Sequence, residues 1–294
     1  MKPFSLNIRG EIREFCRPLV MGILNVTPDS FFEGSRTLSD ANEVERIEMM
    51  ASRLIREGAD MVDVGGCSTR PGAAPVPLME ESRRVRLGIE AVRRISPEVM
   101  VSVDTFRSQV ARSAVEEWGA DIVNDISAGM LDREMIPAVA RMGVPYIMMH
   151  TRGTPDTMGR LTAYPHGVVA GVASELRERV VEASQAGIAD IIIDPGFGFA
   201  KTIGQNYELM AGLRELGHLL DDRPILVGLS RKSMIYKPLG ITPADALAGT
   251  VALNTAAMER GAAILRVHDV GICRQAVDVT GMLLDRQTDI TGQP

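Results

Sequence analysis

The feature that most constrains the fold is an eightfold alternation of short apolar runs with segments of helical periodicity. The runs are rich in β-branched residues and are bounded by Gly, Pro, Asp or Asn, which is typical of buried parallel strands. They cover residues 19–24, 61–64, 100–103, 122–124, 145–149, 191–194, 225–228 and 263–267. Each run is therefore predicted to be a buried strand.

Helical patterns fill the intervals between these runs, over residues 40–56, 80–94, 108–118, 133–141, 168–186, 206–216, 243–260 and 270–284. Several of them end at a glycine, which commonly stops a helix. Eight strand–helix repeats predict an α/β fold, a single (β/α)₈ TIM barrel, with an open doubly wound sheet as the alternative. No Pro/Ser-rich linker divides the chain, so residues 1–294 are predicted to form one domain.

Residues 4–15 have a different pattern from the repeats. Phe4, Leu6 and Ile8 alternate with polar residues, Gly10 follows, and the alternation resumes at Ile12. This pattern predicts a short N-terminal β-hairpin, which we expect to cover the bottom of the barrel.

Composition excludes several classes of protein. The net charge of −6 argues against a nucleic-acid-binding surface, and the apolar runs are too short to span a membrane. No secretory signal is expected, because the N-terminus lacks an apolar core. Three widely spaced cysteines predict no disulfide framework, and the four histidines form no zinc-binding motif. We therefore expect a cytoplasmic protein with neither nucleic-acid nor membrane partners.

Polar residues recur just after the predicted strands, where the active site of a barrel lies. Packing does not require them, so together they predict a polar pocket. They are Asn25, Asp104, Asn124, Asp194, Lys232, Arg266 and His268.

The two carboxylates of this pocket suit a flat heterocycle that is rich in N–H donors. Asp104 and Asp194 would accept charge-assisted hydrogen bonds from it, with Asn124 beside them. Lys232 would donate to a ring carbonyl or nitrogen. The ring would be walled by Phe199, Met148 and Ile126.

A second half-site is predicted beside the first. Arg266 and His268 suit a multiply charged anion such as a phosphate. Asn25 beside them suits Mg²⁺, which needs few protein ligands because it keeps water and binds phosphate oxygens.

Other residues in these segments have simpler interpretations. Asp125, Asp269 and Thr105 are interpreted as helix-cap or turn residues. His150 is equally consistent with a buried structural histidine, and residues 81–86 are interpreted as a solvated helix face. The segment 196–202 ends in Lys201-Thr202 but lacks the glycine that a phosphate-binding P-loop requires.

Eight segments, in order along the chain, resemble the dihydropteroate synthases, the sulfonamide-sensitive enzymes of folate synthesis. They are MGILNVTPDSFFEG (21–34), DVGGCSTRPGA (63–73), SVDTF (102–106), NDISAG (124–129), MMHTRGTP (148–155), DPGFGFAKT (194–202), LSRKS (229–233) and RVHDV (266–270). The resemblance extends over nearly the whole chain, and the ordered set is more specific than any one segment.

The resemblance implies a homodimeric barrel that joins p-aminobenzoate to 6-hydroxymethyl-7,8-dihydropterin pyrophosphate, giving 7,8-dihydropteroate and pyrophosphate with Mg²⁺. It implies that the pterin is held by Asp104, Asn124, Asp194 and Lys232. The wall residues Ile126, Met148 and Phe199, together with Gly228, complete the predicted pterin-binding set. Asn25 would contact Mg²⁺, and Arg266 with His268 would hold the pyrophosphate. The p-aminobenzoate site would contain Phe31, Thr69, Arg70, Pro71 and Ser233. Catalysis is expected to rest on Asp104, Asp194, Lys232, Arg266 and His268.

One position departs from the family pattern. The second loop usually reads Gly-Gly-Glu-Ser-Thr-Arg-Pro-Gly, and here Cys67 stands in place of the Glu, which removes a charge from that loop. Two alternatives remain open, a methyltetrahydrofolate methyltransferase and a pterin-binding paralogue that has lost turnover. The segments 68–72 and 230–233 argue against the first alternative, and the complete set of polar strand ends argues against the second.

Overall fold

The structure is a computed structural model that describes residues 2–27, 40–68, 74–154 and 157–291. Eight parallel strands of these residues close into a barrel in the order β10-β3-β4-β5-β6-β7-β8-β9. The strands are β3 (Leu19–Asn25), β4 (Met61–Gly65), β5 (Met100–Asp104), β6 (Ile122–Asp125), β7 (Tyr146–Met149), β8 (Ile191–Asp194), β9 (Ile225–Val227) and β10 (Ala262–Val267). The predicted barrel is confirmed, and the open sheet is excluded by the pairing of β10 with both β3 and β9.

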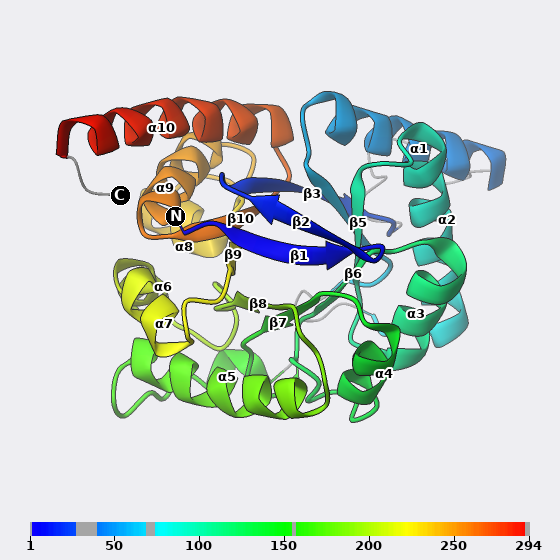
Figure 1. The fold of residues 1–294 in the computed structure, drawn as a ribbon, viewed down its shortest axis with the longest axis horizontal. Helices are drawn as coiled ribbons and strands as arrows, with labels where there is room; N and C mark the ends of the chain where they lie inside the picture. Colours follow the sequence, from blue (N-terminus) through cyan, green and yellow to red (C-terminus); the bar gives the residue numbers. More distant parts are fainter. Residues whose placement is uncertain (1, 28–39, 69–73, 155–156, 292–294) are drawn as a thin grey trace.

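Helices surround the barrel and connect its strands (Figure 1). They are α1 (Asp40–Arg56), α2 (Leu78–Ile95), α3 (Ser108–Ser113), α4 (Met135–Met142), α5 (Val168–Gln185), α6 (Ile203–Ala211), α7 (Leu213–Leu219), α8 (Ser233–Leu239), α9 (Leu247–Glu259) and α10 (Val270–Thr291). A π-helical turn, Ala114–Trp118, continues α3, and Met158–Arg160 forms a 3₁₀ turn. No helix in the described ranges combines the length and the apolar character needed to cross a membrane.

Alternation along each strand separates two apolar cores. Residues such as Val62, Val64 and Val123 point outward and pack against the helices. Inward residues at the lower ends of the strands, such as Met61 and Ile192, fill the barrel. Because side chains alternate between the two faces of a strand, every second residue of each strand points into the barrel.

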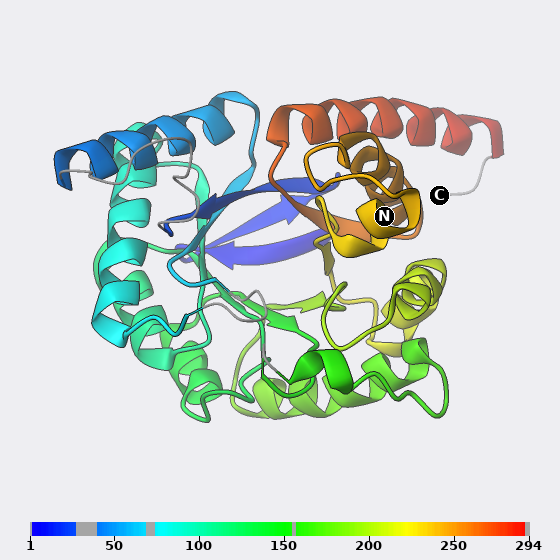
Figure 2. The ribbon, with the colours of Figure 1, turned by 180° about the vertical axis from the view of Figure 1, so that it is seen from behind.

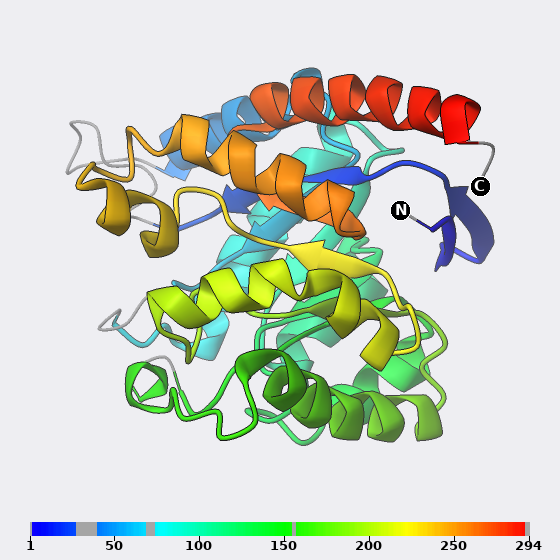
Figure 3. The ribbon, with the colours of Figure 1, turned by 90° about the vertical axis from the view of Figure 1, so that its left-hand side faces the viewer.

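The N-terminal hairpin closes the lower end of the barrel, as predicted. β1 (Phe4–Ile8) and β2 (Glu11–Phe15) pair in antiparallel register. Leu6 and Ile8 are fully buried among the inward residues of the lower core. Figure 3 shows the hairpin at one end of the barrel and α8 at the other, and Figure 2 views the barrel from the side opposite the hairpin.

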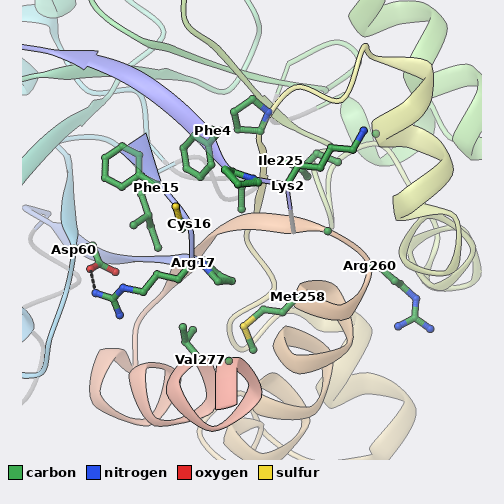
Figure 4. Close-up of a pocket in the computed structure, with 18 of the residues that line it drawn as sticks. Lys2, Phe4, Phe15, Cys16, Arg17, Asp60, Ile225, Met258, Arg260 and Val277 are labelled. Atoms are coloured by element: carbon green, nitrogen blue, oxygen red, sulfur yellow. Dashed lines mark hydrogen bonds and ion pairs between the residues drawn. The ribbon is translucent and has the colours of Figure 1, made fainter. Parts of the chain in front are cut away.

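An open cavity of about 1620 Å³ lies beside this hairpin. It runs between the hairpin and the helices α7, α9 and α10. Its wall includes Met258, Val277 and the adjacent rings of Phe4 and Phe15, which are tilted by 32° to each other (Figure 4). The ion pair between Arg17 and Asp60 crosses one side of it. This cavity is therefore at the end of the barrel away from the polar strand ends.

Three helical expectations needed correction. The predicted helix over 206–216 is two helices, α6 and α7, which meet at Gly212, where a Cβ would lie 2.6 Å from Val169. The predicted helix over 108–118 changes from α to π geometry after Ser113. The short helix α8 was missed, because seven residues that include Pro238 give little periodic signal.

Candidate active site

The upper ends of the inward strand faces carry polar side chains in place of the apolar residues below them. Alternation places the last inward positions of five strands at Asn25, Asp104, Asn124, Asp194 and Arg266. Their register brings neighbours together, since Asn25 pairs with Gly65 and Gly65 pairs with Asp104. These predicted site residues therefore lie at the same end of the barrel.

Arg266 sits between two carboxylates. Its Nε donates to Asp63 Oδ2 at 2.6 Å, and its Nη2 donates to Asp104 Oδ2 at 2.7 Å. Asn124 Nδ2 also donates to Asp63 Oδ2, at 3.0 Å. The two half-sites expected from the sequence are thus joined, because the predicted anion-binding arginine is bonded to the predicted pterin-binding carboxylate.

Asp63 is the residue that sequence reasoning missed. It is fully buried, and its second oxygen, Oδ1, has no hydrogen-bond partner among the described residues. The signal was present, because Asp63 is the one charged residue in the apolar run 61–65, and a buried charge is rarely retained without a partner.

The electrostatics of this group are those of buried, coupled charges. Burial raises the pKa of Asp104 above its usual value, and Arg266 opposes the shift. Burial alone would lower the pKa of Arg266, but the carboxylates of Asp63 and Asp104 raise it beyond its usual value. The arginine therefore stays charged, and it holds Asp104 in place beside it.

Asp194 and Lys232 form the other side of the site. Asp194 Oδ1 accepts a hydrogen bond of 2.8 Å from the amide of Gly196. Burial raises the pKa of Asp194, and the charge of Lys232 opposes this shift. Lys232 donates to Phe197 O at 2.5 Å, and its ammonium lies 4.9 Å from the centre of the Phe199 ring. The three predicted residues Asp194, Lys232 and Phe199 are thus brought together.

Gly228 lies beside two cations of the site, and a Cβ there would meet both at ordinary contact distances. A Cβ at this position would lie 3.9 Å from Lys232 Nζ and 3.8 Å from Arg266 Cβ. Burial lowers the pKa of Lys232 to about 8, and Asp194 counteracts that shift. The lysine is therefore able to donate to a ligand at neutral pH.

His268 lies at the exposed rim of the site. Ser230 Oγ lies 3.1 Å from His268 Nδ1 and accepts a hydrogen bond from the His268 amide. Asp269, which was interpreted as a helix-cap or turn residue, lies directly before α10 and also forms two hydrogen bonds of 2.8 and 2.9 Å with Arg231. Arg231 has a φ of 56°, so this ion pair holds the backbone just before Lys232.

Met148 does not line the site, contrary to the prediction. Its side chain is fully buried in the outer core with Tyr146, against the helices. Met149, one residue along, shares the inward face with Ile147. The prediction was displaced by one position. Ile126 directly follows the last residue of β6, two positions after Asn124, and is 6% exposed.

Cys67 lies at the base of the second loop and contacts a buried carboxylate. Glu81 has no exposed surface and accepts hydrogen bonds from Thr105 and Arg107. Burial and the adjacent Glu81 raise the pKa of the Cys67 thiol to about 12.

The prediction that residues 81–86 form a solvated face was wrong for Glu81, although Arg83 and Arg86 are exposed and paired with glutamates of the same helix.

The remaining predicted residues divide into two groups. Phe31, Thr69, Arg70 and Pro71 lie outside the described residues. Ser233 is partly buried and is the first residue of α8, directly after Lys232.

Asp125 is a turn residue, as predicted. One of its oxygens accepts from the amide and hydroxyl of Ser127, and the other accepts from the amide of Gly129. Thr105 has a similar local role, since its hydroxyl accepts a hydrogen bond from the amide of Arg107.

Comparisons with known proteins agree with this geometry. The family described as pterin binding enzyme matches residues 21–268. The chain is 42% identical over 272 residues to the dihydropteroate synthase of Escherichia coli strain K12, with 92% of each chain covered. It is 44% identical to the folic acid synthesis protein fol1 of Schizosaccharomyces pombe, of whose length it spans 36%.

Solved structures give the same relationship. The dihydropteroate synthase of Xanthomonas albilineans with 4-aminobenzoic acid superposes with a TM-score of 0.86 at 41% identity, covering 95% of this chain and 98% of that one. The same enzyme in complex with 7,8-dihydropteroate gives a TM-score of 0.83 at 39% identity, with the same coverage. The chain belongs to the pterin-binding enzymes and, within them, to the dihydropteroate synthases.

Proposed function

We propose that this protein joins p-aminobenzoate to 6-hydroxymethyl-7,8-dihydropterin pyrophosphate, giving 7,8-dihydropteroate and pyrophosphate. The observation that carries the proposal is the ring of polar side chains at the upper end of the barrel, with Asp104, Asn124, Asp194 and Lys232 directed into one space. The structures of the Xanthomonas albilineans enzyme named above contain 4-aminobenzoic acid and 7,8-dihydropteroate, which supports the same ligands here.

The pterin would lie between the carboxylates. Asp194 would accept hydrogen bonds from the N–H groups of the pyrimidinone edge, and Asn124 would bond a second edge of the ring. Lys232 would donate to a ring acceptor, and Phe199 would cover one face. The cation–π contact between Lys232 and Phe199 supports this arrangement, because it places the donor and the apolar wall beside each other.

The chemical step is a substitution at the methylene carbon of the pterin. The carbon–oxygen bond breaks, and its electron pair leaves with pyrophosphate, while electron donation from the ring stabilises the positive carbon. The nitrogen lone pair of p-aminobenzoate then forms the new bond, and that nitrogen loses a proton to solvent water. Asp104 and Asp194 would stabilise the cationic pterin, and Arg266 with His268 would stabilise the charge that develops on pyrophosphate.

The amine of p-aminobenzoate is neutral, so it needs positioning more than activation. Its site is proposed to include Ser233 and the loop residues Phe31, Thr69, Arg70 and Pro71. Sulfonamides, which resemble p-aminobenzoate, would compete for the same site.

Mg²⁺ is proposed as the cofactor, and the residues present fit it. Asn25 is partly exposed at the end of β3. Gly65, which faces it, has no side chain, and even a Cβ at Gly65 would lie 3.5 Å from Asn25 Oδ1, so this oxygen is accessible to an ion. Among the described residues no group of three or more His, Cys, Asp or Glu is placed to hold a metal ion. Asn25 would therefore be the protein ligand, with pyrophosphate and water supplying the rest. When bound, Mg²⁺ neutralises charge on the leaving group.

A coupled assay of pyrophosphate release tests the function. Release should require the pterin pyrophosphate together with p-aminobenzoate. No release under these conditions, with pterin still bound, would favour the paralogue without turnover. Methyl transfer from methyltetrahydrofolate to a corrinoid would favour the methyltransferase.

We further propose that the protein is a cytoplasmic homodimer. Helix α10 exposes Ile272, Val279, Met282 and Leu283, and α8 exposes Leu239. Exposed apolar side chains grouped on one helix, as on α10, favour a protein interface, and a second copy of the chain is the partner we propose.

A further inference from the structure

Lys201 is a buried lysine that the proposed reaction does not use. It follows the segment Pro195–Ala200, which connects β8 to α6, and only 9% of its surface is exposed. Its ammonium lies 3.0 Å from three acceptors, which are Gly196 O, Phe199 O and His150 Nδ1. A lysine has three N–H donors, so this geometry uses all of them.

The hydrogen bonds continue from His150 to the surface of the barrel. His150 is 3% exposed, and its Nε2 lies 3.1 Å from Glu175 Oε2. Glu175 also pairs with Arg152, which stacks 3.8 Å from the centre of the Tyr164 ring. Tyr164 in turn donates to Ala200 O at 3.2 Å. The segment 195–200 is therefore bonded from both its start and its end.

The hydrogen-bond partners of Lys201 and His150 determine where the protons lie in the series Lys201–His150–Glu175. Two backbone carbonyls need two N–H groups from Lys201, and the Glu175 carboxylate needs the proton of His150 Nε2. One further proton must lie between Lys201 Nζ and His150 Nδ1. Burial lowers the pKa of His150 to about 4 and that of Lys201 to about 7, so the lysine takes up this proton in preference to the histidine.

The segment held in this way forms one wall of the site. The Gly196 amide donates to Asp194, and Phe197 O accepts from Lys232. Gly196, Gly198 and Ala200 have φ values of 69°, 83° and 49°, a left-handed backbone that costs free energy at a non-glycine residue such as Ala200. Such a conformation persists only where the surroundings hold it.

We propose that Lys201, bonded through His150 to Glu175, is a positioning residue that holds the segment 195–200 so that Asp194, Phe199 and Lys232 meet one pterin. The ammonium binds the carbonyls of Gly196 and Phe199, on either side of the carbonyl that accepts from Lys232. Without it, the carbonyls of Gly196 and Phe199 would lose their donor, and the three pterin-contacting groups would lose part of their common geometry.

This proposal rests on the proposed function, and two measurements distinguish a failure of the function from a failure of the role proposed for Lys201. The affinity for 6-hydroxymethyl-7,8-dihydropterin is measured by calorimetry, and the KM for p-aminobenzoate is measured in the pyrophosphate assay. If the wild-type protein neither binds the pterin nor releases pyrophosphate, the function itself is wrong. If the wild-type protein does both, the variants below test Lys201.

Lys201→Met keeps the length of the side chain and removes its donors. We expect the dissociation constant of the pterin to rise about tenfold, as for the loss of a charge-assisted hydrogen bond, with the KM for p-aminobenzoate nearly unchanged. Lys237→Met is the matched control, because Lys237 is exposed near the end of α8, and it should bind as the wild type does.

Chemical rescue distinguishes positioning from packing. Ethylammonium added to Lys201→Ala should restore most of the pterin affinity, since it returns a charged group with N–H donors to the space. Tetramethylammonium carries the charge without donors and should not. Equal rescue by both ions, or by neither in a folded variant, would contradict the hydrogen-bonded role.

Glu175→Gln tests the far end of the chain and covers the case in which the lysine variants do not fold. The Glu175 side chain is 40% exposed, so the substitution should be tolerated. Losing the carboxylate weakens the preference of His150 for a proton on Nε2, and we expect the pterin dissociation constant to rise about threefold. Wild-type affinity in Glu175→Gln, or in a folded Lys201→Met, overturns the proposal.

Discussion

At the scale of single residues, the site is held together by charges that are already paired before any ligand binds. Arg266 bridges Asp63 and Asp104 through two different nitrogens. A buried ion pair is costly to break, because the remaining charge loses both water and partner. The orientation of Asp104 therefore depends on Arg266, which changes what an arginine substitution is expected to do.

Arg266→Lys keeps the charge but cannot bond both carboxylates with one planar group. We expect weaker binding of plain pterin as well as of the pterin pyrophosphate, because Asp104 loses its partner. Calorimetry with both ligands measures this. A loss confined to the pyrophosphate form would mean that Arg266 contacts only the leaving group.

Asp194→Asn should weaken pterin binding by about 1.5–3 kcal/mol, the range for hydrogen bonds to a charged group. Asp190→Asn is the control, because Asp190 lies at the other end of β8, where it accepts from the Asn7 amide. Titration calorimetry of both variants gives the comparison. Unchanged affinity in Asp194→Asn would remove this carboxylate from the pterin site.

The burial of His150 predicts a pH effect on stability. Its pKa is about 4 in the folded protein, against about 6.5 when exposed. Between these values the unfolded chain binds a proton that the folded protein does not, so stability falls as the pH drops from about 6.5 to 4.

Urea unfolding at pH 7 and at pH 4 measures this effect. The wild type should lose roughly 2–3 kcal/mol more than His150→Gln over this interval, because an amide does not titrate. Parallel losses in the two proteins would show that another group accounts for the acid sensitivity.

At the scale of elements, the connection between β8 and α6 is shaped by close contact with β7. A Cβ on Gly196 would lie 1.9 Å from His150 O, a distance that no packing adjustment of side chains can relieve. The segment must therefore keep a glycine there in order to present its amide to Asp194.

Gly196→Ala should destabilise the protein by more than about 3 kcal/mol and weaken pterin binding. Gly143→Ala is a matched control, since Gly143 has a similar φ of 65° with nothing within 4 Å of a Cβ, and should cost only about 1–2 kcal/mol. Thermal unfolding and pterin titration compare them. Similar losses in both would mean that backbone strain alone, without the contact to His150, explains the effect.

Much of this architecture was predictable, because the spacing of apolar residues predicts the alternation of strands and helices. The polar strand ends were predictable for the same reason, since a barrel places them at one rim. The sequence marks Asp63 as unusual, since it is the one charged residue in the run 61–65, but its role could not be predicted, because that role depends on Arg266, which is 203 positions away. Met148 was misplaced because a one-residue error in a strand reverses the face.

Glu81 illustrates a different limit of sequence reasoning. The pattern of alternating Glu and Arg in α2 predicts surface pairs, and most of those residues form them. Glu81 instead faces inward, where it meets Thr105, Arg107 and Cys67 from other elements. The composition of one helix cannot show which of its charges has buried partners elsewhere.

At the scale of the whole molecule, the exposed apolar residues of α10 predict an association that can be measured. The double variant with Val279→Asp and Met282→Asp should shift the protein from dimer to monomer, because a buried charge at an interface is costly. Light scattering after size-exclusion chromatography gives the mass. Met79→Asp is the control, since Met79 is 79% exposed on α2, and a dimer that persists in the double variant would place the interface elsewhere.

The hairpin of β1 and β2 has a consequence for inhibition. Leu6 and Ile8 seal the lower end of the barrel, so both substrates and both products would pass through the same upper opening. A molecule wide enough to occupy that opening would then slow entry and exit together, whatever part of the site it contacts. Among inhibitors of equal affinity, those wide enough to fill the upper opening would also slow the release of product.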